Sequence, residues 1–155
     1  MHASLWLPVG YLAIVCVPLS VIDLREHRLP NPLTYPAIAL AGLSAVWLLV
    51  VGDYPRAIAS LIAGASTFGV GYGLARLELV GMGDVKLLTA AHSVLAGINP
   101  ILILISLFSA FALATALNVA QLVAGRISLR SPVAMGPFLL VGFFLALGLT
   151  NPWEA

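Results

Sequence analysis

Charged side chains are scarce in this sequence. Only 8% of the 155 residues are Asp, Glu, Lys or Arg, whereas a soluble globular domain has about 25%. Hydrophobic residues make up 61% of the chain, and its mean hydropathy is +1.09. These values exclude a water-soluble domain and predict an integral protein of a lipid bilayer.

Cysteine pairs and an excess of basic charge are also lacking. The one cysteine, Cys16, lies in an apolar run and can form neither an intrachain disulfide nor a Cys-x-x-Cys pair. The formal net charge is +1 and the seven Lys and Arg residues are dispersed, which argues against nucleic-acid binding. His27 and His92 have no third ligand at metal-like spacing, so we expect no metal and no cofactor.

Long apolar runs fill most of the chain. Because a helical crossing needs about 20 apolar residues, the length allows about six spans. We expect an all-α, polytopic transmembrane bundle that forms one domain over residues 1–155. The expected spans are 4–22, 35–51, 57–75, 84–98, 101–124 and 133–149. Small residues let helices approach closely in lipid, so the glycine-rich span 57–75 is expected in the middle of the bundle.

The first connection is polar and rich in proline. Proline is poorly tolerated inside a helix, so the chain must turn between the first two spans. Thr34 is expected to cap the second helix, with Tyr35 and Pro36 in its first turn.

The placement of Lys and Arg predicts the orientation. With the N-terminus outside, six of these residues fall on one side of the membrane and only Arg56 falls on the other. Cytoplasmic ends of spans carry an excess of Lys and Arg, so we expect both termini on the outer, periplasmic side. A five-span layout with a re-entrant fourth segment would place two of the six outside. The six residues are Arg25, Arg28, Arg76, Lys86, Arg126 and Arg130.

Two aspartates lie at ends of spans on this inner side. Asp23 ends the first span and Asp84 begins the fourth. Ionisable residues in a membrane usually face the bundle interior and carry function. Two carboxylates within hydrogen-bond reach share a proton, so one can act as base toward water and the other as acid toward a carbonyl. Whether the two meet depends on the order of the helices in the bundle.

Neighbours of Asp84 have their own expected roles. Gly81 and Gly83 lack a Cβ, so the backbone there can adopt conformations closed to other residues and approach a substrate strand. Lys86 either anchors to lipid headgroups or places a positive charge beside the carboxylate.

Both aspartates lie in stretches that resemble one family. Gly81-Met82-Gly83-Asp84-Val85-Lys86-Leu87-Leu88 is similar to the Gly-x-Gly-Asp-x-Lys-Leu signature of type IV prepilin peptidases, which are aspartic proteases of bacterial inner membranes. Asp23-x-Arg25-x-x-x-Leu29-Pro30-Asn31 resembles the first aspartate motif of that family. Met135-Gly136-Pro137-Phe138 resembles a Phe-Gly-Pro element, with Met in place of Phe.

The resemblance implies a function. The family removes the short basic leader of prepilins and pilin-like proteins, including pseudopilins, at the cytoplasmic face of the inner membrane. By this resemblance Asp23 and Asp84 are the catalytic pair, and the supporting residues are Gly81, Gly83, Lys86, Arg25, Pro30 and Asn31. Larger members carry paired cysteines and also N-methylate the product. This chain resembles instead the short, peptidase-only members of tight-adherence (Flp-type) pilus systems, so methylation is not expected.

A different class of function uses the same carboxylates. Intramembrane Asp residues also serve proton-coupled transporters and channels. Such proteins usually line their path near the midplane, whereas both aspartates here are expected at one surface. A catalytically inactive assembly protein is a third possibility, which the presence of both aspartates disfavours.

Overall fold

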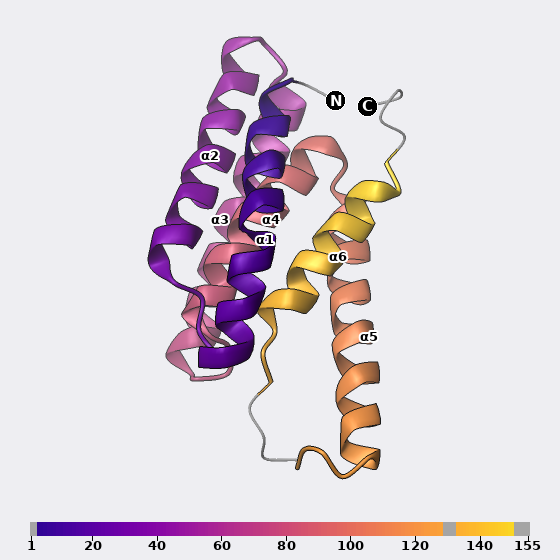
Figure 1. Cartoon of the computed structure of the whole chain (residues 1–155). Helices are drawn as coiled ribbons and strands as arrows, with labels where there is room; N and C mark the ends of the chain where they lie inside the picture. The colour runs from indigo at the N-terminus through magenta and orange to yellow at the C-terminus, as the bar shows by residue number, and fades with distance from the viewer. Residues whose placement is uncertain (1–2, 129–132, 151–155) are drawn as a thin grey trace.

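The chain is a bundle of helices in the computed structural model, which describes residues 3–128 and 133–150 (Figure 1). The all-α prediction is confirmed, and no strand occurs in these two ranges. The elements are η1 (Ala3–Leu5), α1 (Trp6–Glu26), α2 (Asn31–Val50), α3 (Tyr54–Arg76), α4 (Met82–Ile98), α5 (Ile101–Val123) and α6 (Gly136–Gly148).

Four of the helices are long and apolar enough to cross a membrane, namely α1, α2, α3 and α5. The other two, α4 and α6, have 17 and 13 residues. At a rise of 1.5 Å per residue they extend about 25 and 20 Å, less than the roughly 30 Å of a hydrocarbon core. The fold is therefore that of a membrane protein in which two short helices pack among four longer ones.

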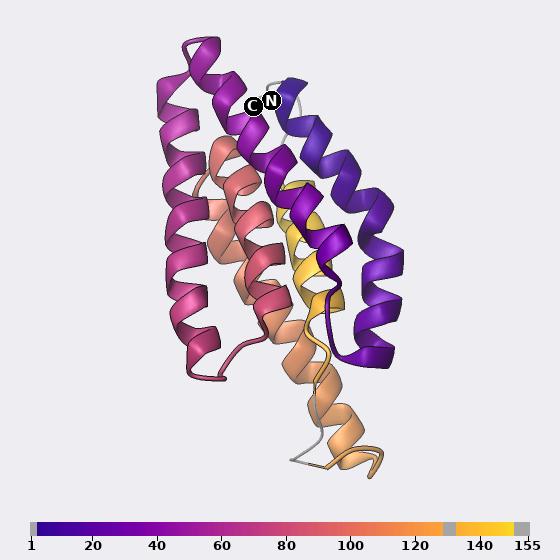
Figure 2. The ribbon, with the colours of Figure 1, turned by 90° about the vertical axis from the view of Figure 1, so that its left-hand side faces the viewer.

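The central helix is α4, and the expectation that span 57–75 lies in the middle is wrong. Most of α4 is buried, whereas few residues of α3 are. The small residues of α3 instead allow it to pack closely on α4, and the two helices lie side by side in Figure 2. A Cβ on Gly71 would lie 2.6 Å from Cγ1 of Val85. The Ser60 hydroxyl also donates to the carbonyl of Ser93 at 2.7 Å, and the Ser93 hydroxyl donates back at 3.0 Å.

Helix α2 begins earlier than expected, at Asn31, and Thr34 is not its cap. Thr34 is fully buried, and its hydroxyl donates to the carbonyl of Pro30 at 3.4 Å. Pro32 is accommodated because the first turn of a helix does not use its backbone N–H groups. Pro32 therefore lies in the first turn of α2, and the helix begins before it, at Asn31.

The basic residues gather at one end of the bundle. Arg25 and Arg76 lie in the last turns of α1 and α3, and Lys86 lies near the start of α4, all at the lower end of Figure 1. Arg56 lies in the first turn of α3, at the opposite end. Arg130 falls outside the described residues.

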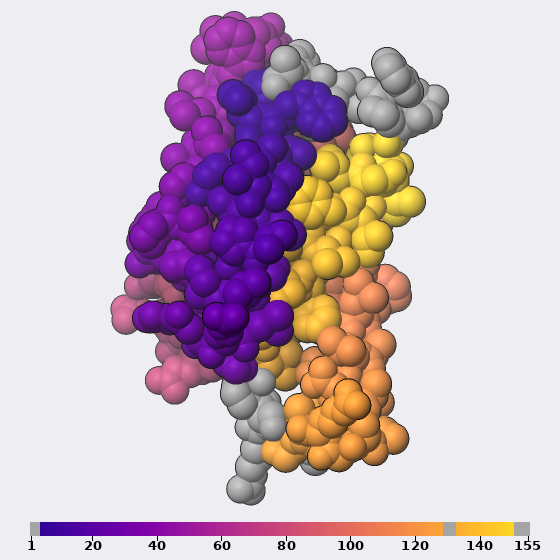
Figure 3. All heavy atoms as spheres, in the orientation of Figure 1, coloured from indigo at the N-terminus to yellow at the C-terminus, as the bar shows by residue number. Residues whose placement is uncertain are grey.

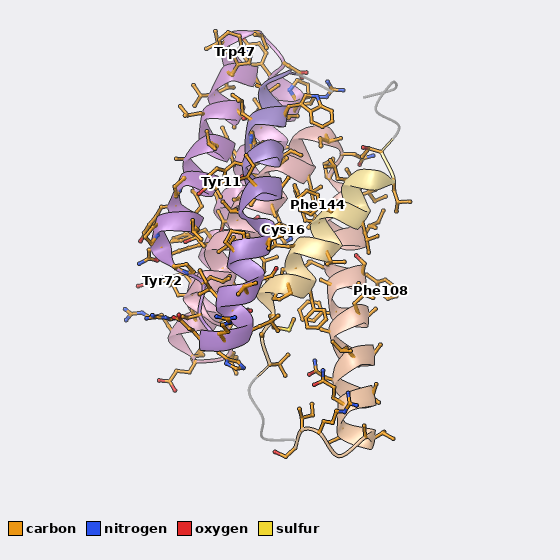
Figure 4. The ribbon with its side chains drawn as sticks, viewed as in Figure 1. Tyr11, Cys16, Trp47, Tyr72, Phe108 and Phe144 are labelled. Carbon is orange, nitrogen blue, oxygen red and sulfur yellow. The ribbon has the colours of Figure 1, made fainter. Side chains whose placement is uncertain are left out.

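Helices α5 and α6 form a hairpin, and α6 also packs against α1 (Figure 3). The lower part of α5 extends beyond the other helices, and Phe108 on α5 points away from the bundle with 77% of its surface exposed (Figure 4). Gly142 brings α6 against α5, because a Cβ there would lie 2.9 Å from Cβ of Ala110 and would overlap the carbonyl oxygen of Ser106.

We expect Gly142→Ala to lower the free energy of unfolding by about 1–3 kcal/mol, because rigid backbone of α5 leaves no room for the methyl group. Thermal unfolding of the purified protein in detergent measures the change. Gly69→Ala is the matched control, since nothing lies within 4 Å of a Cβ at Gly69 on α3. Equal unfolding temperatures for the two variants would contradict the close packing of α5 and α6.

Candidate active site

Asp23 is buried at the end of α1, with 4% of its surface exposed. Its Oδ2 atom accepts a hydrogen bond of 2.8 Å from the backbone N–H of Gly136, the first residue of α6. The first N–H groups of a helix have no partner within the helix, and they favour an anion. The start of α6 therefore satisfies a carboxylate that would be costly to bury alone.

Leu29 packs between the starts of two helices. It is buried in the connection between α1 and α2. A Cβ on Gly83 would lie 2.7 Å from Cβ of Leu29, and a Cβ on Gly136 would lie 3.0 Å from Cδ2 of Leu29. The two glycines therefore make room for the same side chain, and Leu29 joins the chain around Asp23 to the start of α4.

Asp84 is the third residue of α4 and lines a cavity of about 650 Å³, whose walls come from α3, α4, α5 and α6 and from the segments before α4 and α6. Asp23 does not line this cavity. The two carboxylates are near enough for their charges to interact. No hydrogen bond between Asp23 and Asp84 is found within residues 3–128. The fold thus brings near each other two aspartates that are 61 positions apart in the sequence. Asp23 lies at the end of α1 and bonds to the start of α6, whereas Asp84 lies at the start of α4 and lines the cavity.

Lys86 joins α4 to α2. Its Nζ atom donates to Oδ1 of Asn31 at 2.6 Å and lies 4.4 Å from the centre of the Tyr35 ring. Among the described ion pairs none includes Lys86 and an aspartate. The positive charge therefore contacts an amide and an aromatic face at the start of α2, and this contact holds the α1–α2 connection against α4.

The other residues expected to support the aspartates lie at the end of α1, just before α2 and around the start of α4. Arg25 is exposed in the last turn of α1, and Pro30 precedes the first residue of α2. Gly81 precedes α4 with φ −68° and ψ 134°, a conformation open to any residue. Gly83 lies within α4 and is helical, so the expectation that Gly81 and Gly83 supply unusual backbone conformations is wrong. The absence of a Cβ at Gly83 instead makes room for Leu29.

Three contact residues were not assigned a role from the sequence. Leu29 and Gly136 lay in the quoted motifs, but only the fold shows that both contact the neighbourhood of Asp23. The sequence predicted Tyr35 in the first turn of a helix but did not indicate that its ring lies against Lys86. No cluster of three or more His, Cys, Asp or Glu side chains suited to a metal occurs in the described parts of the chain.

We expect Lys86→Met and Asn31→Ala each to lower the free energy of unfolding by about 1 kcal/mol, through loss of their shared hydrogen bond. The double variant should lose little more than either single variant, because both remove the same contact. Thermal unfolding in detergent tests this. Arg28→Ala is the control, since its pair with Glu26 is exposed and contributes little. Additive losses in the double variant would show that Lys86 and Asn31 act separately.

Comparison with known proteins links this arrangement to one family. The sequence model described as the type IV leader peptidase family matches residues 10–119, which include Asp23 and Asp84. The prepilin leader peptidase/N-methyltransferase of Xanthomonas campestris pv. campestris is 31% identical over 143 residues, covering 88% of this chain and 48% of that protein. Prepilin peptidase EppA of Methanothermobacter thermautotrophicus is 32% identical over 142 residues, covering 91% of this chain and 36% of that protein.

The chain thus spans about half the length of the first relative and about a third of the second. No solved structure matches it. The family match covers most of the helices described above and both aspartates that the fold brings to one end of the bundle. The chain belongs to the type IV leader peptidase family.

Proposed function

We propose that this chain is a membrane-embedded aspartic endopeptidase that removes the short basic leader of prepilins or pilin-like proteins. The observation that supports the proposal is that Asp23, in the last turn of α1, and Asp84, in the first turn of α4, lie at the same end of the bundle, near enough for their charges to interact. The family match and the names of both relatives support a leader peptidase. Helices α1 to α6 act together as one peptidase domain.

In this scheme one water molecule lies between the two carboxylates. One aspartate is ionised and takes a proton from the water, while the protonated partner donates to the carbonyl oxygen of the scissile peptide. Hydroxide adds to the carbonyl carbon, and the C–N bond breaks as a proton passes to the leaving nitrogen. The N–H of Gly136 keeps Asp23 in place throughout, and the chemistry needs no metal or cofactor.

The proposed location is the cytoplasmic face of a bacterial inner membrane. Arg25, Arg76, Lys86 and Arg126 lie at the ends of helices on the same side of the bundle as the two aspartates. Such an excess of positive charge is typical of cytoplasmic ends. A leader that is basic and cytoplasmic would then meet the site from that side.

We expect Asp23→Asn and Asp84→Asn each to reduce leader removal at least about a hundredfold, because each loses a proton-transfer group. The chain is co-expressed with a candidate prepilin, and processing is followed by the change in pilin mass. Asp53→Asn is the matched control. Asp53 caps α3 at the other end of the bundle by accepting from the N–H of Arg56, and asparagine caps equally well.

Full cleavage by either Asn variant would rule out the paired mechanism. If the wild-type chain cleaves no prepilin at all, transport of protons through the same carboxylates or a role in assembly becomes the better explanation.

We expect Gly136→Ala to lower the rate of cleavage about tenfold or more without unfolding the protein. Its Cβ would lie 2.9 Å from Oδ2 of Asp23, so the carboxylate must shift although the N–H remains. Gly148→Ala in the same helix is the control, because a Cβ there meets nothing within 4 Å. Equal rates for both variants would show that the position of Asp23 does not depend on α6.

A further inference from the structure

A second cavity adjoins the one at Asp84. It has a volume of about 370 Å³ and is lined by α5 and by residues between α5 and α6. Three residues line both cavities, namely Phe111 on α5 and Val133 and Met135 before α6. These three residues therefore border the space beside Asp84 on the side of the α5–α6 hairpin.

Met135 also starts α6. It is half-buried, packs against the apolar core and directly precedes Gly136, the first residue of the helix. The peptide bond between Met135 and Gly136 is bonded at both edges. Its carbonyl oxygen accepts from the N–H of Leu139 at 3.0 Å, and its N–H donates to Oδ2 of Asp23 at 2.8 Å. Because a peptide group is planar, a shift of Met135 that turns this plane also turns the N–H that holds Asp23.

The two aspartates differ in their access to the cavity. Asp84 lines it and Asp23 does not, so a substrate chain in this space would touch Asp84 directly. Asp23 lies behind the start of α6, which packs beside α1 (Figure 1). Met135 lines the cavity, and its own peptide bond carries the hydrogen-bond donor of Asp23. Contact with Met135 can therefore reach the carboxylate that the cavity itself does not expose.

We propose that Met135 is a positioning residue of the peptidase. A substrate chain in the cavity at Asp84 packs against its side chain and so keeps the Gly136 N–H, and with it Asp23, in the position that cleavage needs. This inference rests on the proposed peptidase function. Methionine suits the role, because its unbranched and flexible side chain adapts to differently shaped neighbours.

Phe111 provides the matched comparison. It lines the same two cavities from α5, and its peptide bond carries no hydrogen bond to Asp23. The variants are Met135→Ala, Met135→Leu and Phe111→Ala, and both alanine variants are also combined with Gly136→Ala. KM and kcat are measured for leader removal from a full-length prepilin by the full chain in detergent, and thermal unfolding shows whether each variant is folded.

We expect Met135→Ala to lower kcat about tenfold and to change KM less than about threefold, because a misplaced catalytic group costs rate more than binding. Met135→Leu should recover most of the lost kcat, since leucine nearly conserves the volume of the side chain. Phe111→Ala should instead raise KM about fivefold through lost apolar contact, with kcat changed less than about threefold.

The double variants test whether Met135 acts through Asp23. Met135→Ala combined with Gly136→Ala should lower kcat little more than either change alone, because both displace the same carboxylate. Phe111→Ala combined with Gly136→Ala should show the KM effect of the first and the kcat effect of the second together. A general loss of stability would not produce this difference between the two pairs.

Three results would overturn the inference alone while the wild-type chain cleaves. They are an unchanged kcat in Met135→Ala, multiplied losses of kcat in its combination with Gly136→Ala, and a loss of kcat in Phe111→Ala as large as in Met135→Ala. If Met135→Ala does not fold, Met135→Val loses only the end of the side chain and carries the same expectations. Absence of cleavage by the wild-type chain overturns the proposed function and this inference together.

Discussion

The fit of Leu29 between Gly83 and Gly136 is the contact on which the geometry of the site depends. It joins the connection after α1 to the first turns of α4 and α6. A side chain at either glycine would separate these segments. Because Gly136 also donates its N–H to Asp23, the same contact determines where one carboxylate lies and how near the other comes.

A membrane setting makes the internal hydrogen bonds especially important. Polar groups among apolar side chains have no water to bond, so helices in lipid pair them with one another. Asp23 pairs with the start of α6, and Ser60 exchanges hydrogen bonds with Ser93 between α3 and α4. The short helix α4 is mostly buried among its neighbours, and the short helix α6 packs on α5 and α1. Against this background the buried Nε2 atom of His92 stands out, because residues 3–128 and 133–150 provide no hydrogen-bond partner for it.

Expectations that rested on long apolar runs were more accurate than those that rested on single residues. Six helices and their approximate bounds follow from the lengths of the apolar runs. The roles of Thr34 and of the glycines before Asp84 were wrong, because they depend on which neighbour each residue meets. Glycine in a membrane helix indicates that another segment packs closely against it, but the sequence does not identify that segment. Thus α3 packs Gly64 and Gly71 on α4 from the outside of the bundle, whereas Gly69 and Gly73 meet nothing within 4 Å.

The sequence by itself determined a helical membrane protein, the family to which it belongs and the two aspartates that its motifs contain. These properties depend on the composition and on the order of neighbouring residues along the chain, and neither requires the chain to fold. Only the tertiary structure decided that Asp23 bonds to Gly136, that Lys86 contacts Asn31 and that Asp84 and His92 line the same cavity. The two hydrogen bonds join different helices, and the cavity is lined by several helices. All three therefore depend on how the helices pack, which the lengths of the apolar runs do not specify.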